Sequence, residues 1–145
     1  MIALIQRVSS ARVMVDGQIR AEIAAGLLAL IGVERLDSAA QGTRLLERLL
    51  DYRVFADTAG RMNRSLRDTA GGLLLVPQFT LAADTSSGNR PGFSAAAEPA
   101  RARALFEQLC AAATAAHQAV AVGEFGAHME VTLTNDGPVT FWLKA

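Results

Sequence analysis

Two short runs of consecutive apolar residues constrain the fold of this chain more than any other feature. One run covers residues 27–33 after Gly26, and the other begins at Leu73, directly after the Gly71-Gly72 pair. A strand with one face in water alternates between apolar and polar residues, whereas a strand covered on both faces has no need of polar positions. The sequence therefore predicts two central strands with protein packed on both sides of them.

Further strands are predicted from alternating patterns and turn residues. Residues 1–15 form a long strand that ends at the turn signal Asp16-Gly17, after which residues 18–23 return beside it. Three shorter segments complete this assignment: a strand at residues 53–55, an ordered loop without a clean period at residues 61–68, and a strand at residues 119–122.

Two segments have helical spacing. Ser38 and Gln41 have the spacing of a capping box, and four leucines at helical spacing follow before the expected end near Asp51. Pro99 suits the first turn of a second helix. The core face expected for this second helix consists of Leu105, Leu109, Ala112 and Ala116. With strands mixed among only two main helices, the expected fold class is α+β, one mixed sheet or barrel-like core.

The length and composition are typical of one globular domain. The chain has 145 residues, 51% of them hydrophobic, which is enough to form a buried core without disulfide bonds. We therefore expect a single domain over residues 1–145. The start of the chain does not have the pattern of a signal peptide, and no apolar run approaches the roughly 20 residues that cross a bilayer. The expectation is a soluble, cytoplasmic protein with no membrane partner.

Metal or cofactor chemistry is not indicated. Cys110 is the only cysteine and lies within a helical pattern, where a small apolar role is favoured over a nucleophilic one. His117 and His128 do not have the spacing of metal ligands. We expect neither a metal site nor a cofactor.

The charge pattern gives a weak indication of phosphate binding. The formal net charge is zero, which argues against a broad basic surface for nucleic acid. Thirteen of the 14 basic residues are arginine, and four of them lie within residues 53–67. Arginine forks suit phosphates, but coding bias and ordinary surface solvation explain this count equally well.

Pro77 interrupts the second apolar strand. Proline cannot donate to a strand ladder, so pairing is expected to fail there and to leave the amides of Gln78, Phe79 and Thr80 free. Free amides suit an oxyanion or a nucleotide. Alternatively, Gln78 and Thr80 simply face solvent at the end of a strand. The polar, glycine-rich segment 84–93 that follows is too long for a tight hairpin and is a candidate lid or contact segment.

A second unusual segment lies close to the end of the chain. The alternating residues 128–134 and 139–143 flank Asn135-Asp136-Gly137-Pro138. The simpler interpretation is a hairpin turn that reverses the chain. Pro138, however, has no amide hydrogen to help close a hairpin, and a Gly-Pro step presents carbonyl groups that suit an ammonium ligand. The sequence leaves both interpretations open, as it does the isomer of the Gly137-Pro138 bond.

Four stretches, in their order and spacing, match one known family. They are Met1-Ile-Ala-Leu-Ile-Gln-Arg-Val8, Pro77-Gln-Phe-Thr-Leu81 with Ala83-Asp-Thr85 and Arg90-Pro91, Phe125-Gly-Ala-His-Met129, and Asn135-Asp-Gly-Pro-Val-Thr140. Together they resemble the D-aminoacyl-tRNA deacylases, formerly called D-tyrosyl-tRNA deacylases, and the resemblance runs essentially from end to end. It implies an enzyme that hydrolyses the ester of D-aminoacyl-tRNA without a cofactor.

The resemblance also implies a homodimer with shared active sites. Gly137 and Pro138, joined by a cis bond, would reach into the partner subunit and hold the α-ammonium of the aminoacyl group with their carbonyl oxygens. An L side chain would collide with this backbone, so L substrates are excluded, while glycine is also cleaved. Arg7 matches the residue that holds the Gly-Pro step, and Phe125 and Met129 would form the walls of the pocket for the terminal adenosine.

For the chemistry, the resemblance points to Gln78, Phe79 and Thr80. The amides of Phe79 and Thr80 could stabilise the tetrahedral oxyanion, a contribution of roughly 3–4 kcal/mol per donor in other enzymes. Thr80 is the candidate nucleophile of the family pattern, but no histidine or carboxylate in the motif is an evident base for it. We favour attack by water assisted by the 2′-hydroxyl of the substrate.

The chain departs from the family pattern at one position. The family usually begins this motif with serine, and here Pro77 takes its place. A mechanism that requires the serine hydroxyl is excluded, and catalysis by the main chain is favoured. Two alternatives remain: a hydrolase of small esters with Thr80 as nucleophile, and a module that binds RNA ends without turnover. The neutral charge predicts recognition of the acceptor end with a shallow salt dependence.

Overall fold

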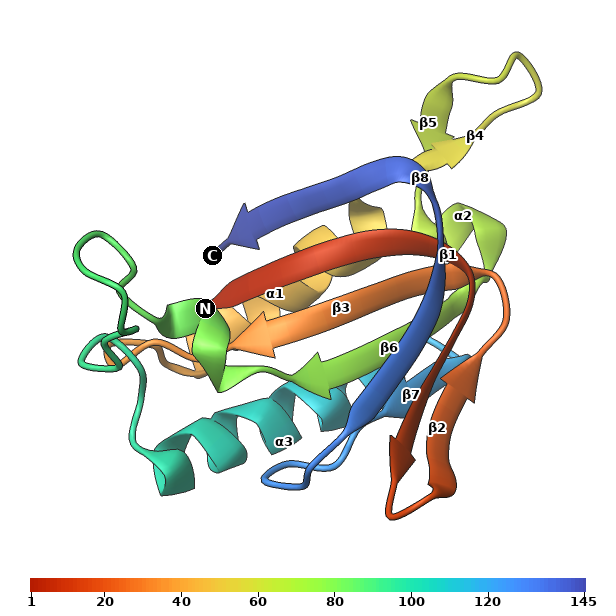
Figure 1. Ribbon diagram of the computed structural model, residues 1–145. Helices are drawn as coiled ribbons and strands as arrows, with labels where there is room; N and C mark the ends of the chain where they lie inside the picture. Colours follow the sequence, from red (N-terminus) through yellow and green to blue (C-terminus); the bar gives the residue numbers. More distant parts are fainter.

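The computed structural model describes residues 1–145 and contains a six-stranded mixed sheet that curls towards a barrel (Figure 1). The strand order is β2-β1-β3-β6-β7, and β8 pairs with β1 along nearly the whole length of that strand. The strands of this sheet are β1 (Ile2–Val15), β2 (Gln18–Ile23), β3 (Gly26–Gly32), β6 (Gly72–Pro77), β7 (Val120–Val122) and β8 (Glu130–Lys144). The expected α+β class with a mixed, barrel-like sheet is confirmed.

The remaining elements lie around this sheet. They are the helices α1 (Ala39–Asp51), α2 (Leu66–Thr69) and α3 (Pro99–Ala116), the 3-10 turn η1 (Phe79–Ala82), and a separate two-stranded sheet of β4 (Phe55–Ala56) and β5 (Met62–Arg64). None of the helices is long and apolar enough to span a bilayer.

The two apolar runs form the centre of the sheet, as predicted. β3 and β6 pair in parallel, and successive residues of β6 enter two different cores. Leu73 and Leu75 belong to the large core that includes α1 and α3, whereas Leu74 and Val76 belong to a smaller core on the opposite face. Because side chains alternate across a strand, an apolar residue at every position means that both faces are covered.

The capping box of α1 is present, but the predicted core face of α3 is partly wrong. The Ser38 side chain accepts from the amide of Ala40, and Gln41 accepts from the amide of Ser38. In α3, Ala112 and Ala116 are exposed. The buried face consists of Ala102, Leu105, Phe106, Leu109 and Ala113. The physical reason is that this rotation of the helix buries the large ring of Phe106, which stabilises more than burying two further alanines.

Of the two interpretations left open for residues 135–138, the hairpin does not form. β8 is one long bent strand, and both of its halves pair antiparallel with β1 instead of with each other. The register shifts between Gln6 and Val8 and again between Val8 and Ser10, so that β1 and β8 bend together. The turn-forming residues therefore make an outward bulge opposite Arg7 and not a chain reversal. The Gly137-Pro138 bond is cis, and both residues are exposed.

Residues 61–68 are more regular than the loop that was expected. They contain β5 and the start of α2, which begins with a second capping box formed by Ser65 and Asp68. The strand predicted at residues 53–55 begins two residues later, at Phe55. The β4-β5 pair projects from the molecule beside the bend of β8 (Figure 1).

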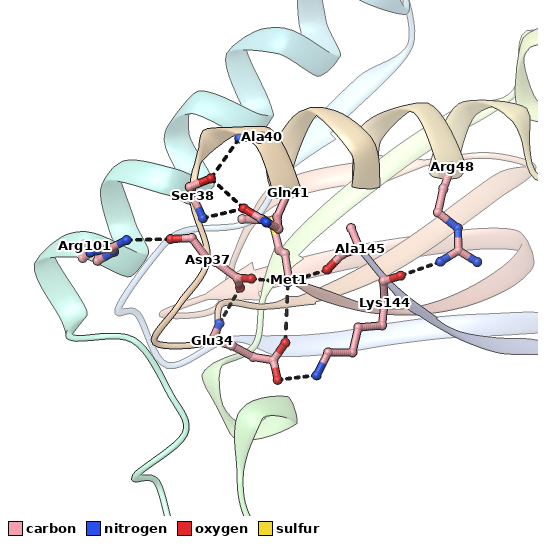
Figure 2. A network of polar contacts seen from close by, with 10 residues as sticks. All are labelled: Met1, Glu34, Asp37, Ser38, Ala40, Gln41, Arg48, Arg101, Lys144 and Ala145. Carbon is pink, nitrogen blue, oxygen red and sulfur yellow. Dashed lines mark hydrogen bonds and ion pairs between the residues drawn. The ribbon is translucent and has the colours of Figure 1, made fainter.

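A polar network joins the two ends of the chain to the helical layer (Figure 2). The buried α-ammonium of Met1 is bonded to Asp37 and lies 3.5 Å from a carboxylate oxygen of Glu34. Glu34 also pairs with Lys144 at 2.7 Å, and Arg101 of α3 donates to the carbonyl of Asp37 at 2.7 Å. The chain start before β1, the end of β8, α3 and the loop before α1 are thereby joined by charged groups.

Candidate functional site

A cavity of about 460 Å³ opens where β6 ends. Its walls come from the end of β6 and the residues just after it, the start of α3, and the segment that leads into β8. Four residues predicted for the site contribute to these walls: Gln78, Phe79, Phe125 and Met129. Eight of the 13 lining residues are hydrophobic, so the cavity offers apolar and aromatic surface with a few polar groups, which is usual for a small-molecule site.

The turn after Pro77 supplies main-chain donors beside this cavity. The amide of Gln78 donates to the carbonyl of Ile31 at 2.7 Å, so the prediction that it is free is wrong. Phe79 and Thr80 are the first two residues of η1, and the first amides of a helical turn have no acceptor inside it. Two successive amides, and not three, are therefore available to a ligand.

The Thr80 hydroxyl is not activated as a nucleophile in this structure. Its side-chain hydrogen-bond partner is the amide group of Gln78, which donates to it. A donor cannot remove the proton of an attacking hydroxyl, and neither a histidine nor a carboxylate contacts Thr80. Thr80 is exposed next to the cavity but does not line it.

The aromatic wall of the cavity is held by a residue that sequence reasoning missed. The guanidinium of Arg103 lies 4.8 Å from the centre of the Phe125 ring, and its Nη2 donates to the carbonyl of Phe125 at 3.0 Å. Phe125 also packs against Phe106, with ring centres 6.1 Å apart. Arg103 lies on α3, 22 positions away in the sequence. Only the tertiary fold brings it to Phe125, so no local pattern indicated it.

Arg7, for which the resemblance predicted a role in holding the Gly-Pro step, contacts the bend of β8. Its Nε lies 2.8 Å from a carboxylate oxygen of Asp136 and 3.2 Å from the Asp136 carbonyl, and its Nη1 donates to the carbonyl of Val54 at 2.5 Å. The side-chain amide of Asn135 donates to the carbonyls of Arg7 and Val139 at 2.9 and 3.1 Å. These bonds fix the residues on both sides of the Gly-Pro step.

A single copy of the chain does not bring all predicted site residues together. Gly137, Pro138 and Arg7 are not among the residues that line the cavity. Figure 1 shows the bend of β8 at one end of the sheet, whereas β6 runs towards the opposite end before it continues into η1. The predicted residues therefore form two separate groups, one at the cavity and one at the bend.

Cys110 and the histidines do not form a reactive centre. Burial, with a smaller contribution from the nearby charge of Glu107, raises the pKa of Cys110 to about 12. The thiol is therefore protonated near neutral pH, in agreement with the predicted apolar role. His117 is bonded to the carbonyl of Gly71 at 2.7 Å. Three or more metal-ligating side chains do not come together anywhere in the chain.

Comparison with solved structures shows the same fold in two proteins. The c-Myc DNA unwinding element binding protein superimposes with a TM-score of 0.96 over 100% of this chain and 99% of its own, at 32% identity. A probable eukaryotic D-amino acid tRNA deacylase superimposes with a TM-score of 0.87 over 99% of this chain and 98% of its own, at 16% identity. The second likeness concerns the fold alone.

Sequence comparison identifies the family. A protein named D-aminoacyl-tRNA deacylase from Thioalkalivibrio sulfidiphilus is 64% identical over 144 residues, which cover 99% of this chain and 97% of the relative. A protein of the same name from Xanthomonas euvesicatoria pv. vesicatoria is 66% identical over 145 residues and 99% of both chains. The family described as D-Tyr-tRNA(Tyr) deacylase matches residues 4–144. The chain therefore belongs to this family of enzymes, as its motifs predicted.

Proposed function

We propose that this enzyme hydrolyses the ester that joins a D-amino acid to the 3′-terminal adenosine of tRNA, and that it meets this substrate in the cytoplasm. The observation that carries the proposal is the pair of unbonded amides at Phe79 and Thr80 beside an aromatic cavity. The cavity suits a nucleoside base, and the amides suit the ester carbonyl at its edge. Family membership and the names of the relatives support the same reaction.

In this proposal the adenosine binds between Phe125 and Met129. Phe125 offers a ring on which a base can stack, and Arg103 restrains that ring from the side of α3. Met129 supplies an adaptable apolar surface on the other side of the base. With the base held there, the aminoacyl ester extends towards η1.

The reaction needs little from side chains because the substrate is an activated ester. Water adds to the ester carbonyl, the amides of Phe79 and Thr80 bind the resulting oxyanion, and the C–O bond to the ribose then breaks. The 2′-hydroxyl of the same ribose assists the water, and the departing 3′-oxygen takes up a proton. Pro77, which replaces the usual serine, leaves no hydroxyl at that position, in keeping with main-chain catalysis.

We further propose that the bend of β8 completes the active site of a partner subunit. Gly137 and Pro138 are exposed and lie away from the cavity of their own chain, so joint use of both groups requires a second copy. Their carbonyls would bind the α-ammonium, and their backbone would exclude an L side chain by collision. Arg7, anchored to Asp136 and Val54, would keep this backbone in place. Glycine has no side chain to exclude, so glycyl-tRNA would also be cleaved.

Subunit complementation tests the shared site. Gly137→Val adds a side chain at the bend, and Met129→Trp fills the cavity; each variant alone should be inactive on D-tyrosyl-tRNA. When the two are coexpressed, half of the dimers are mixed. In a mixed dimer, the unchanged cavity of the Gly137→Val subunit meets the unchanged bend of the Met129→Trp subunit, so one of its two sites is intact. About a quarter of the wild-type activity should therefore return. If activity stays at the level of the single variants while mixed dimers form, the site lies within one chain and the shared-site proposal is wrong.

A Thr80 substitution separates this mechanism from a threonine-nucleophile hydrolase. Thr80→Ala keeps the amide and removes the hydroxyl, so the main-chain mechanism predicts a loss of less than about tenfold in kcat. A loss of about a thousandfold or more would establish Thr80 as the nucleophile. A module that only binds RNA ends would leave both D- and L-tyrosyl-tRNA intact.

A further inference from the structure

Two exposed aromatic rings lie beside the cavity, and the proposed reaction does not use them. The Phe79 side chain is 59% exposed and the Phe93 side chain is 42% exposed, yet they pack against each other with ring centres 5.2 Å apart. Large exposed aromatic side chains cost free energy in water, so a contiguous pair marks a binding surface. Phe79 lines the cavity, and Phe93 packs against Phe79 without being a lining residue itself.

The main chain holds both rings in position. Phe79 follows Gln78, whose amide is bonded to the carbonyl of Ile31. Phe93 follows Gly92, whose amide and carbonyl are both bonded to Asp84, at 2.9 and 2.7 Å. Just beyond Phe93, the carbonyl of Ala95 accepts from the amide of Arg35 at 2.8 Å. Phe93 therefore lies between two backbone tethers, and a ligand would meet a surface that is already formed.

The same segment carries an unpaired positive charge. Arg90 is the only charged residue in positions 85–97 and is exposed, and it takes part in none of the ion pairs of the chain. The carboxylate of Asp84 at the base of the segment accepts from Ser86, and this bonding lowers the pKa of Asp84. Arg90 precedes Phe93 by three residues. An arginine and an aromatic pair on one segment suit single-stranded nucleic acid, because rings stack on bases and an arginine fork binds phosphate.

We propose that Phe93 and Phe79 form a stacking platform for the unpaired nucleotide that precedes the terminal adenosine, with Arg90 bound to the adjoining phosphate. The inference rests on the proposed function, because that function places the terminal adenosine in the cavity. In the proposed arrangement the next nucleotide leaves the cavity on the side of these two rings. In this proposal the segment 84–93, predicted to be a lid or contact segment, contacts the tRNA nucleotide before the terminal adenosine.

Substrates of two lengths test the platform. The first is D-tyrosyl-tRNA, and the second is 3′-O-D-tyrosyladenosine, which ends before the platform. Phe93→Leu keeps the apolar bulk and removes the ring, so kcat/KM for D-tyrosyl-tRNA should fall about tenfold, mainly through KM, with no change for the adenosine ester. Phe93→Trp, which keeps an aromatic face, should retain the wild-type values for both substrates. Arg90→Gln should weaken the tRNA reaction alone and reduce its salt dependence.

Three results would overturn the platform. Equal loss on both substrates would mean that Phe93 has only a structural role, and unchanged hydrolysis of D-tyrosyl-tRNA by Phe93→Leu would mean that no stacking occurs. A change of oligomeric mass on Phe93→Leu would show that a second subunit covers the rings.

If the wild-type protein hydrolyses neither substrate, the proposed function fails. Binding of the uncharged trinucleotide CCA still tests the platform, since Phe93→Leu must bind it more weakly than Phe93→Trp does.

Discussion

Individual residues at the site show where local sequence patterns were informative. Pro77 correctly indicated that regular pairing ends there, because a residue without an amide hydrogen cannot continue a ladder on that side. The pattern could not show that Gln78, directly after it, would still reach the carbonyl of Ile31. The contact of Arg103 with Phe125 was likewise invisible, since it depends on the packing of α3.

Arg7 should be sensitive even to a conservative substitution. A lysine has one compact ammonium and cannot bond both Asp136 and Val54 from the positions that the planar guanidinium occupies. We expect Arg7→Lys to lower kcat/KM for D-tyrosyl-tRNA by about tenfold or more while the midpoint of urea unfolding changes little. Arg12→Lys, on the same strand at an exposed position, is the matched control and should leave the rates unchanged. Wild-type kinetics in Arg7→Lys would contradict an anchoring role.

Cys110 should react slowly with alkylating reagents in the folded protein. Burial raises the pKa of its thiol to about 12, and only the thiolate is nucleophilic. At pH 8, iodoacetamide should therefore modify the folded protein at least about a hundredfold more slowly than the urea-unfolded chain. The raised pKa also means that the contribution of this thiol to stability is complete below the pKa of the unfolded chain and declines as pH rises towards 12. Alkylation at equal rates would show that the thiol is accessible and ionised.

At the scale of secondary structure, periodicity identified the elements but not how they pair. The apolar runs of β3 and β6 and the capping box of α1 were recognisable because each depends on residues close in sequence. The two halves of β8 were also recognised as strands. The sequence left their pairing open because Asn, Asp and Gly indicate a change of direction without distinguishing a reversal from a bulge. The decisive partner, β1, lies more than a hundred residues away in the sequence.

The parallel pairing of β3 and β6 depends on two glycines in contact. A Cβ added to Gly26 would lie 1.9 Å from the carbonyl oxygen of Gly72, which is far inside the contact distance. Gly26→Ala should therefore separate the strands and destabilise the protein by about 3 kcal/mol or more in urea unfolding. Gly42→Ala is the matched control, because its Cβ meets only Met1 Cε at an ordinary 3.8 Å. In a helix, this control should be neutral or stabilising by up to about 1 kcal/mol. Equal stability of the two variants would refute the close approach.

At the scale of the whole molecule, the ends of the chain are joined by buried charge. The α-ammonium of Met1 is fully buried and Asp37 is nearly so, whereas the pair formed by Asp51 and Arg67 is exposed. Asp37→Asn removes the directly bonded carboxylate and leaves the ammonium with only Glu34, at 3.5 Å, so it should cost about 3 kcal/mol of unfolding free energy. Asp51→Asn removes a surface pair and should cost less than about 1 kcal/mol. Similar losses in both variants would mean that the buried network in Figure 2 stabilises the fold no more than a surface ion pair does.

The arrangement of the two residue groups also belongs to the whole molecule. Sequence motifs gave the predicted site residues, but only the fold shows that the bend of β8 and the cavity lie apart in one chain. In the proposed mechanism, backbone supplied by a second subunit selects the handedness of the substrate, and two amides of the first subunit stabilise the reacting ester. Neither part requires a reactive side chain.

The most direct test compares the hydrolysis rates of D-tyrosyl-tRNA, L-tyrosyl-tRNA and glycyl-tRNA under identical conditions. The account predicts that the D and glycyl esters are cleaved and that the L ester is cleaved at least about a hundredfold more slowly, since its side chain would collide with rigid backbone. Cleavage of the D and L esters at similar rates would contradict it.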